Sequence, residues 1–293
     1  MGGRVVKPKF TVYHLFLAIP VLYALSLVIF PLVYSAAISF TNWKLGIPTY
    51  EFVGLRNYID EFHDYRFWNS LRVTFLITAG AVPVEIILGL IIAVLMSHQI
   101  KLRGFFRSIL LIPLFTSPVA IALMGEVVMY EAGGPINGYL KLLGLQPISW
   151  RSSATMAPWT VVIWDVWEWT PFCFLIFLAG IQAIPRVYYE AAEIDGASGF
   201  QIFKSITLPM LKYPLITVTM FRLVDTLKIF EIPFVLMAGG GPGIATEVQS
   251  VYIYKAGFRG FQFGAASAYS MVFLIIVMVI MMIFIRRVRS YYA

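Results

Sequence analysis

The sequence predicts an all-α membrane protein with six transmembrane helices, and three observations support this. Hydrophobic residues make up 60% of the chain and charged residues 13%, whereas a soluble domain is nearer half apolar and a quarter charged. Several apolar runs reach the length of about 20 residues that a helix needs to cross a bilayer. Basic residues cluster at the ends of these runs, which is typical of membrane orientation. The net charge of +7 therefore does not indicate a nucleic-acid partner, which would bind a basic stripe on a soluble domain.

The apolar runs form one transmembrane domain that covers residues 1–293. A basic start and an apolar run are shared with signal peptides, but this first run is about twice the 7–15 residues of a signal sequence, so we predict an uncleaved span. Prolines inside several runs predict kinked helices, whose bundle can enclose a cavity. The six spans are placed at about 11–40, 70–97, 105–130, 157–184, 207–238 and 264–285.

Lysine and arginine residues give the orientation of the spans. They are dense near Arg4, Lys101, Arg186 and Arg286, and are more widely spread in the loops of the other side. We therefore place the first set in the cytoplasm. Both chain termini are then cytoplasmic, which requires an even number of spans, and six satisfies this requirement.

Motifs for chemistry are missing from the sequence. His14, His63 and His98 lack the spacing of metal ligands, and the single cysteine, Cys173, lies inside an apolar run. The glycine-rich stretch Gly239–Gly243 lacks the lysine of a phosphate-binding loop. We predict no catalytic residue, no metal and no cofactor bound by this chain, and an intramembrane enzyme is the least supported class of protein.

The segment Ile184–Pro214, between the fourth and fifth spans, predicts two short helices. Residues Val187–Asp195 favour the first helix, Gly196 would terminate it, and Ser198 would cap the second helix through Phe203. The acidic residues of this segment, taken alone, are also compatible with an ordinary solvated loop helix.

The spacing of this segment adds a resemblance. Glu190-Ala191-Ala192, three residues, Gly196, nine residues and then Ile206-Thr207-Leu208-Pro209 resemble the signature of permeases of binding-protein-dependent ABC importers. The resemblance implies a type I importer permease whose coupling loop, 186–206, docks in a cleft of a cytoplasmic ATPase. It assigns this coupling role to Glu190, Ala191, Ala192 and Gly196, with Asp195 beside them.

Other segments resemble the carbohydrate branch of that family, the maltose and glycerol-phosphate type. They are Phe52–Tyr58, Phe230-Glu231 followed by Gly239–Gly243, and Gly264–Ala268. Two positions depart from the branch: Glu231, where Asp is common, and Ala238, where Thr is usual. Both departures bear on the substrate, so the resemblance does not identify the sugar or say whether it is charged.

The resemblance implies a permease subunit of a prokaryotic cell membrane, which forms a sugar pathway with a second, related permease subunit. Two copies of a separate ATPase would bind ATP and magnesium, and an external solute-binding protein would deliver the sugar. The alternative is an ion-coupled secondary transporter of a polar solute, which would use carboxylates inside the membrane.

Ionisable groups inside a membrane are costly and therefore mark candidate functional residues. Arg222, Asp225, Lys228 and Glu231 recur at every third residue of the fifth span, and so predict a ladder of alternating charge along one helix. Such a ladder is either a self-neutralising structural device or the wall of a polar pathway.

The fourth span carries tryptophans beside carboxylates. This pattern suits a sugar, because rings stack on its CH face and carboxylates accept hydrogen bonds from its hydroxyls, but an interfacial aromatic belt would have the same composition. The candidate pathway residues are Trp164, Trp167, Glu168, Asp225 and Glu231.

Overall fold

The computed structural model describes residues 12–47, 49–97 and 101–290. In these ranges the regular elements are all helices, with one isolated antiparallel bridge between Thr41 and Phe52, so the predicted all-α class is confirmed. The chain divides into two units. Unit 1 comprises the chain up to Glu61 together with Ala256–Val272, and unit 2 comprises Phe62–Lys255 and the chain from Phe273 onward.

Unit 1 brings together two segments that are far apart in the sequence. It contains α1 (Val12–Ile38), the first part of α2 (Arg56–His63), most of η3 (Lys255–Arg259) and the first part of α14 (Phe263–Ser290). The backbone N–H of Gly264 donates a hydrogen bond to the carbonyl oxygen of Trp43 at 3.0 Å. A Cβ at Gly264 would lie 2.0 Å from the carbonyl oxygen of Thr41, so this close approach requires glycine.

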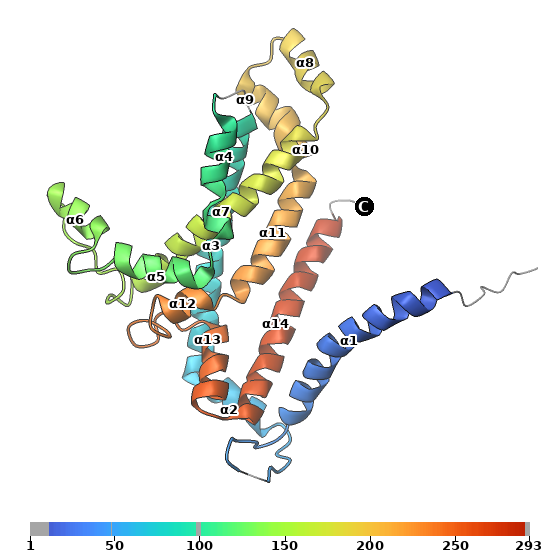
Figure 1. Ribbon diagram of the computed structural model, residues 1–293, viewed down its shortest axis with the longest axis vertical. Coiled ribbons are helices and arrows are strands. Elements are labelled where there is room, and N and C mark those ends of the chain that lie inside the picture. Colours follow the sequence, from blue (N-terminus) through green and yellow to red (C-terminus); the bar gives the residue numbers. More distant parts are fainter. Residues whose placement is uncertain (1–11, 48, 98–100, 291–293) are drawn as a thin grey trace, which may run out of the picture. The chain divides into compact units, whose positions relative to one another are not determined.

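Three long helices form the centre of unit 2 and run side by side (Figure 1): α3 (Tyr65–Ser97), α7 (Ala157–Gln182) and α11 (Lys212–Leu227). A Cβ at Gly89 on α3 would lie only 2.5 Å from the Cβ of Cys173 on α7. Small residues at such positions let helix backbones approach closely, which is how helices pack in a membrane. The buried core of unit 2 follows this contact, with Phe174 and Phe177 fully buried.

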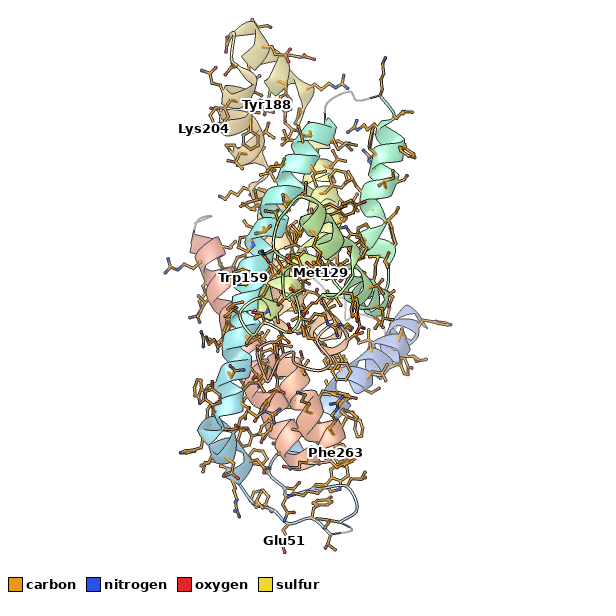
Figure 2. The ribbon with its side chains drawn as sticks, turned by 90° about the vertical axis from the view of Figure 1, so that its left-hand side faces the viewer. Glu51, Met129, Trp159, Tyr188, Lys204 and Phe263 are labelled. Carbon is orange, nitrogen blue, oxygen red and sulfur yellow. The ribbon has the colours of Figure 1, made fainter. Side chains whose placement is uncertain are left out.

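Shorter helices complete unit 2. α8 and α9 lie at one end of the long helices, where Figure 2 labels Tyr188 and Lys204, and α13 lies toward the other end (Figure 1). The shorter elements are α4 (Arg103–Leu111), η1 (Pro113–Phe115), α5 (Pro118–Val128), α6 (Pro135–Leu142), α8 (Arg186–Ile194), α9 (Gly199–Ile202), η2 (Phe203–Thr207), α10 (Leu208–Met210), α12 (Glu231–Val235) and α13 (Gln249–Tyr254).

Four of the described helices are long and apolar enough to cross a membrane: α1, α3, α7 and α14. They correspond to the spans predicted at 11–40, 70–97, 157–184 and 264–285, although α3 begins five residues earlier, at Tyr65. Residue 11 and the two chain ends, on which the predicted orientation of the termini rests, lie outside the described residues.

The helix predicted over 105–130 is not continuous, which corrects that expectation. α4 ends at Leu111, the short η1 follows, and Thr116 and Ser117 are extended before α5 begins at Pro118. A residue before proline favours extended backbone, and proline itself donates no hydrogen bond, so the extended Ser117 ends the preceding segment and Pro118 starts a new helix.

The helix predicted over 207–238 is also interrupted. α11 ends at Leu227 and α12 begins at Glu231. A helix continued to Pro233 would bring the proline ring against the carbonyl group of Ile229, four residues earlier. The predicted ladder of four charges on one helix is therefore wrong beyond its first pair, Arg222 and Asp225.

Candidate functional site

A buried arginine connects the three long helices of unit 2. The guanidinium of Arg222 on α11 donates hydrogen bonds to both carboxylate oxygens of Glu85 on α3, at 2.5 and 2.9 Å. It also donates to Asp165 on α7 at 2.9 Å and to Asp225 on α11 at 2.8 Å. The side chains of Arg222 and Glu85 are fully buried. One cation thus satisfies three carboxylates, and its donors are directed at protein groups.

A pocket of about 270 Å³ lies beside this cluster. We call it the acidic pocket. Its lining includes Asp165, Glu168 and Trp169 from α7, Asp225 and Lys228 from the end of α11, Glu231 and Ile232 from α12, and also Pro118 and Ile229.

Both helix interruptions open onto the acidic pocket. Pro118 begins α5, and Lys228, Ile229 and Glu231 surround the break between α11 and α12. Irregular backbone at membrane depth is tolerated where protein or water satisfies its polar groups. Transporters place substrate sites at such interrupted helices. The breaks therefore position polar groups around a small chamber, which a continuous helix could not do.

Glu168 and Trp169 are the side chains of the acidic pocket best suited to a polar ligand. Glu168 is 4% exposed, and neither a hydrogen bond nor an ion pair involves its side chain among the described residues, although it lines the pocket. The ring centroid of Trp169 lies 4.5 Å from the guanidinium carbon of Arg222, and Trp169 also lines the pocket. A carboxylate that lines a pocket without a protein donor can accept a hydrogen bond from a ligand hydroxyl.

The predicted pathway residues are divided between this pocket and other places. Glu168, Asp225 and Glu231 meet in the acidic pocket. Trp164 is instead buried, with its Nε1 donating to the sulfur of Met129 at 3.2 Å. Trp167 lies on an apolar groove next to Pro171 and Phe174.

The aromatic residue in the pocket is thus Trp169, which the sequence analysis did not select. Trp164 and Trp167 are three residues apart and their rings are in contact, while Trp169 lies next in sequence to Glu168. The position of Trp169 next to Glu168 in the sequence does not predict this, because neighbours along a helix can line different pockets.

The segment α8–α9 is formed as the sequence predicts. α8 covers Arg186–Ile194, Gly196 follows with φ +73°, and Ser198 caps α9 through reciprocal hydrogen bonds with Gln201. These are the glycine terminator and the capping box of short helices.

The residues assigned to coupling lie on this exposed segment. No residue of α8 is buried. Glu190, Ala191, Asp195 and Gly196 are exposed and Ala192 is half-buried. Apolar side chains accompany them, with Val187 62% and Ile194 87% exposed. Exposed apolar side chains rimmed by polar residues are a feature of protein contact surfaces.

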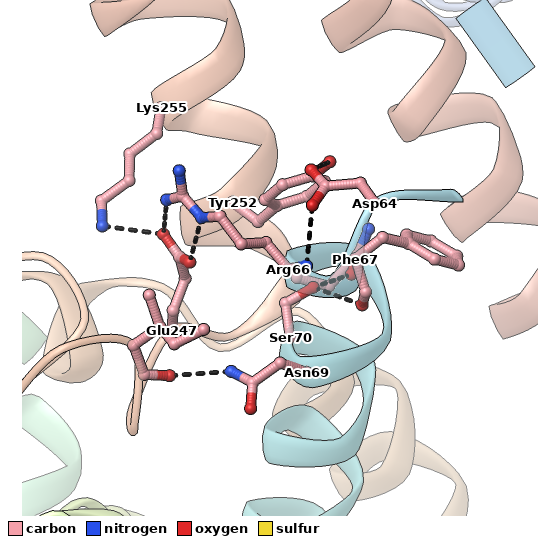
Figure 3. A network of polar contacts seen from close by, with 10 residues as sticks. Asp64, Arg66, Phe67, Asn69, Ser70, Glu247, Tyr252 and Lys255 are labelled. Atoms are coloured by element: carbon pink, nitrogen blue, oxygen red, sulfur yellow. Dashed lines mark hydrogen bonds and ion pairs between the residues drawn. The ribbon is translucent and has the colours of Figure 1, made fainter. Parts of the chain in front are cut away.

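A third cluster holds the glycine-rich loop (Figure 3). The buried carboxylate of Glu247 accepts hydrogen bonds from Arg66 at 2.6 and 3.1 Å and from Lys255 at 2.7 Å. Asn69 donates to the carbonyl oxygen of Ile244 at 2.9 Å. The stretch 238–243 has positive φ at Ala238 and at four glycines. These contacts fix a loop whose backbone only glycine adopts readily.

Comparison with known proteins agrees with this architecture. Residues 85–290 match the family described as binding-protein-dependent transport system inner membrane component. The trehalose/maltose transport system permease protein MalF of Thermococcus litoralis is 37% identical over 286 residues, which cover 98% of this chain and 92% of that protein. The sulfoquinovosyl glycerol transport system permease protein SmoG of Agrobacterium fabrum is 34% identical over 267 residues, covering 90% and 86%.

Solved structures show the same fold. A chain of a bacterial ABC transporter involved in the import of the acidic polysaccharide alginate superposes with a TM-score of 0.85 at 20% identity, covering 95% of each chain. A chain of the methionine transporter MetNI superposes with a TM-score of 0.53 at 18% identity, covering 76% of this chain and 93% of that one. The family match covers α8 and the whole α7–α12 part of the acidic pocket. This chain belongs to the family of inner membrane components of binding-protein-dependent transport systems.

Proposed function

We propose that this chain is a permease subunit of an ATP-driven sugar importer, and that the acidic pocket lines its substrate pathway. The observation that carries the proposal is the convergence of Glu168, Glu231 and Trp169 in one chamber at two helix interruptions. Carboxylates accept hydrogen bonds from sugar hydroxyls and an indole ring covers an apolar sugar face. The names of the relatives, which refer to trehalose/maltose and to sulfoquinovosyl glycerol, support a sugar or a sugar derivative.

The charges of the pocket favour a neutral sugar. Arg222 is occupied by Glu85, Asp165 and Asp225, so it offers little to an anionic substrate. Lys228 is then the cation that lines the pocket, together with the carboxylates of Glu168, Glu231 and Asp225. An acidic sugar would meet more negative than positive groups there.

The pathway is completed by other subunits in this proposal. A second permease subunit forms the other side of the pathway, two copies of an ATPase bind ATP and magnesium, and an external solute-binding protein delivers the sugar. No nucleotide, metal or other cofactor is assigned to this chain. One solved neighbour of the same fold is in complex with a periplasmic protein bound to an alginate pentasaccharide, which supports the last of these partners.

The α8–α9 segment is the proposed ATPase contact, with Glu190, Ala191, Ala192, Asp195 and Gly196 in the coupling loop 186–206. Exposure of the whole of α8 supports this role. The hydroxyls of Tyr189 and Thr207, 3.2 Å apart, connect α8 to the end of η2, which leads through α10 into α11. A displacement of α8 by a bound ATPase would therefore be transmitted to α11, the helix that carries Arg222.

Six spans are proposed for the single domain 1–293: α1, α3, α4 with α5, α7, α10–α12 and α14, with both termini in the cytoplasm. Cysteines introduced at Arg289 and at Glu51 test this topology. In intact cells an impermeant maleimide is expected to label position 51 and not position 289. Labelling of position 289 from outside contradicts the proposed topology.

The function is tested by reconstituting the complete transporter and measuring uptake of labelled neutral disaccharides. Uptake is expected to require ATP hydrolysis and the binding protein, and to be lost in Glu190→Lys, while the charge-matched variant Glu51→Lys retains it. Uptake driven by an ion gradient without ATP would instead support the alternative, an ion-coupled secondary transporter. Full uptake by Glu190→Lys would remove the coupling role from α8.

A further inference from the structure

An apolar groove of about 490 Å³ lies on unit 2 between α3, α4 with η1, and α7. Its walls include Leu88 and Ile92 from α3, Ile109 and Leu110 from α4, and Trp167 and Phe174 from α7. The groove shares no lining residue with the acidic pocket. Its volume falls within the range of roughly 300–1,000 Å³ of ligand sites, and its walls suit a hydrocarbon chain.

Two arginines precede the groove-lining residues of α4 in the sequence. Arg103 and Arg107 are four residues apart on α4 and Leu110 follows three residues later, so all three lie on one face of the helix. Leu110 lines the groove. Arg107 therefore lies about one turn, and Arg103 about two turns, before Leu110 on this face of α4.

Donor atoms of these two arginines are buried without acceptors. The Nε and Nη2 atoms of Arg103 and the Nε atom of Arg107 have no hydrogen-bond partner. Neither arginine forms an ion pair within the described part of the chain. Buried donors without partners are costly, more so on charged groups. Two adjacent cations in this condition indicate an anion that the chain itself does not supply.

The start of α4 adds to this preference for an anion. Its N-cap residue is Leu102, which offers no side-chain acceptor, and its first turn contains no acidic residue. The first N–H groups of the helix are therefore without a side-chain cap, and the positive end of the helix dipole attracts negative charge. An anion beside Arg103 would meet both the helix end and the guanidinium.

We propose that this groove and the arginine pair bind one anionic phospholipid, with its phosphate at Arg103 and Arg107 and an acyl chain along the groove. Charge complementarity selects the headgroup, and the apolar walls select the chain. Basic pockets beside membrane helices are suited to anionic lipid headgroups. Free phosphate would leave the groove empty, and an acidic side chain of a partner protein would not fill it.

Trp167 provides a direct readout because it lines the groove. The assembled transporter is placed in phosphatidylcholine vesicles that contain a small, fixed fraction of acyl-brominated lipid, either phosphatidylglycerol or phosphatidylcholine. Bromine quenches nearby indole fluorescence. The quenching measured for the unmodified protein minus that measured for Trp167→Phe is the quenching of Trp167, and it reports on lipid in the groove. This part is expected to be at least twofold larger with brominated phosphatidylglycerol than with brominated phosphatidylcholine.

Charge variants decide the role of the arginines. In Arg103→Gln/Arg107→Gln the preference for the anionic lipid is expected to disappear, and in Arg107→Gln alone to fall. The matched control, Arg286→Gln/Arg289→Gln, removes two exposed arginines near the end of α14 and is expected to retain the preference. Adding free phosphate is expected to leave the quenching unchanged.

Three results would overturn the proposal. The first is equal quenching by both brominated lipids in the unmodified protein. The second is an unchanged preference in both arginine variants. The third is loss of ATPase subunits from the double variant while Arg107→Gln keeps the full lipid preference, which would assign the pair to a protein contact.

Discussion

Arg222 and Glu85 are 137 residues apart in the sequence, yet the guanidinium of one forms two parallel hydrogen bonds with the carboxylate of the other, at 2.5 and 2.9 Å. Both side chains are fully buried. Paired geometry of this kind is the strongest contact between arginine and a carboxylate. Since Asp165 and Asp225 bind the same guanidinium, one residue links the buried carboxylates of α3, α7 and α11.

Removal of the arginine is expected to destabilise unit 2 strongly. Arg222→Met leaves the carboxylates of Glu85 and Asp165 buried without their cation, and breaking a buried pair in this way costs about 3–5 kcal/mol. The measurement is thermal unfolding of the purified protein in detergent, compared with the unmodified chain.

A triple variant separates lost charge from lost packing. Arg222→Met/Glu85→Leu/Asp165→Leu removes the buried charges together, and replacing a whole buried ionic cluster by apolar residues is often neutral or stabilising. It is expected to recover most of the lost stability. A triple variant as unstable as Arg222→Met would contradict this electrostatic explanation.

The acidic pocket is expected to control sugar uptake through Glu168 and Glu231. Glu231→Gln and Glu168→Gln keep the size of the side chain but weaken it as an acceptor of hydroxyl hydrogen bonds. Loss of such a contact costs about 1–3 kcal/mol, and each 1.4 kcal/mol corresponds to roughly a tenfold change. Uptake by reconstituted transporter, at equal protein levels, provides the measurement.

Two tryptophans give a matched comparison on α7. Trp169→Ala removes the ring that lines the pocket, whereas Trp167→Ala removes a ring that lines the separate apolar groove. Only Trp169→Ala is expected to reduce uptake to the same extent as the glutamate variants. Equal loss of uptake in both alanine variants would mean that α7 acts through general packing.

The loop that contains Glu131 is expected to loosen in acid. Burial alone would raise the pKa of Glu131. Hydrogen bonds from the Ser152 hydroxyl and from the backbone N–H groups of Arg151 and Ser152 together have a larger, opposite effect, so the pKa lies below its usual value of 4.5. A lowered pKa in the folded state stabilises the loop above about pH 4.5, and the stabilisation is lost as the pH falls through the lowered value.

Hydrogen exchange measures this loosening. Exchange at the amide of Ser152, corrected for its intrinsic rate, is expected to accelerate as the pH falls below about 4.5. In Glu131→Gln this pH dependence is expected to vanish, because the amide does not titrate. An identical pH dependence in Glu131→Gln would show that another group opens the loop.

Close approach of α3 and α7 is expected to make Gly89 intolerant of any side chain. A Cβ there would lie 2.5 Å from the Cβ of Cys173 and 2.9 Å from the backbone nitrogen of Phe174. Overpacking of this kind costs about 1–3 kcal/mol, so Gly89→Ala is expected to lower the thermal stability in detergent. Gly138→Ala is the control, because a Cβ on Gly138 in α6 meets no atom within 4 Å. Equal stability of the two alanine variants would show that α3 can shift away from α7.

Helices with local signals are those that the sequence predicts well. α7 begins and ends within two residues of the span predicted at 157–184, because an apolar run of that length has one stable arrangement in a bilayer. The α8–α9 segment is predicted in detail, since Gly196 and Ser198 act on the backbone within a few residues of themselves. Prolines such as Pro118 predict kinks, but the full interruptions at Pro118 and Pro233 are not predicted, because membrane helices often tolerate proline and the sequence does not say which prolines end a helix.

Composition, run lengths and short-range backbone signals therefore determine that this chain is a helical membrane protein with an exposed α8, and the spacing around Gly196 indicates its family. Each of these features depends only on one segment of the chain and on the lipid or water around that segment, so it can be predicted from the residues of that segment alone. The tertiary structure decides which charges meet: Arg222 pairs with Glu85 and Asp165 on other helices, and does not continue a ladder along α11. It also places Trp169, and neither Trp164 nor Trp167, beside Glu168 in the acidic pocket. Such pairings depend on how helices rotate and where they break, because buried charges must find partners across the bundle and no local pattern fixes which ones.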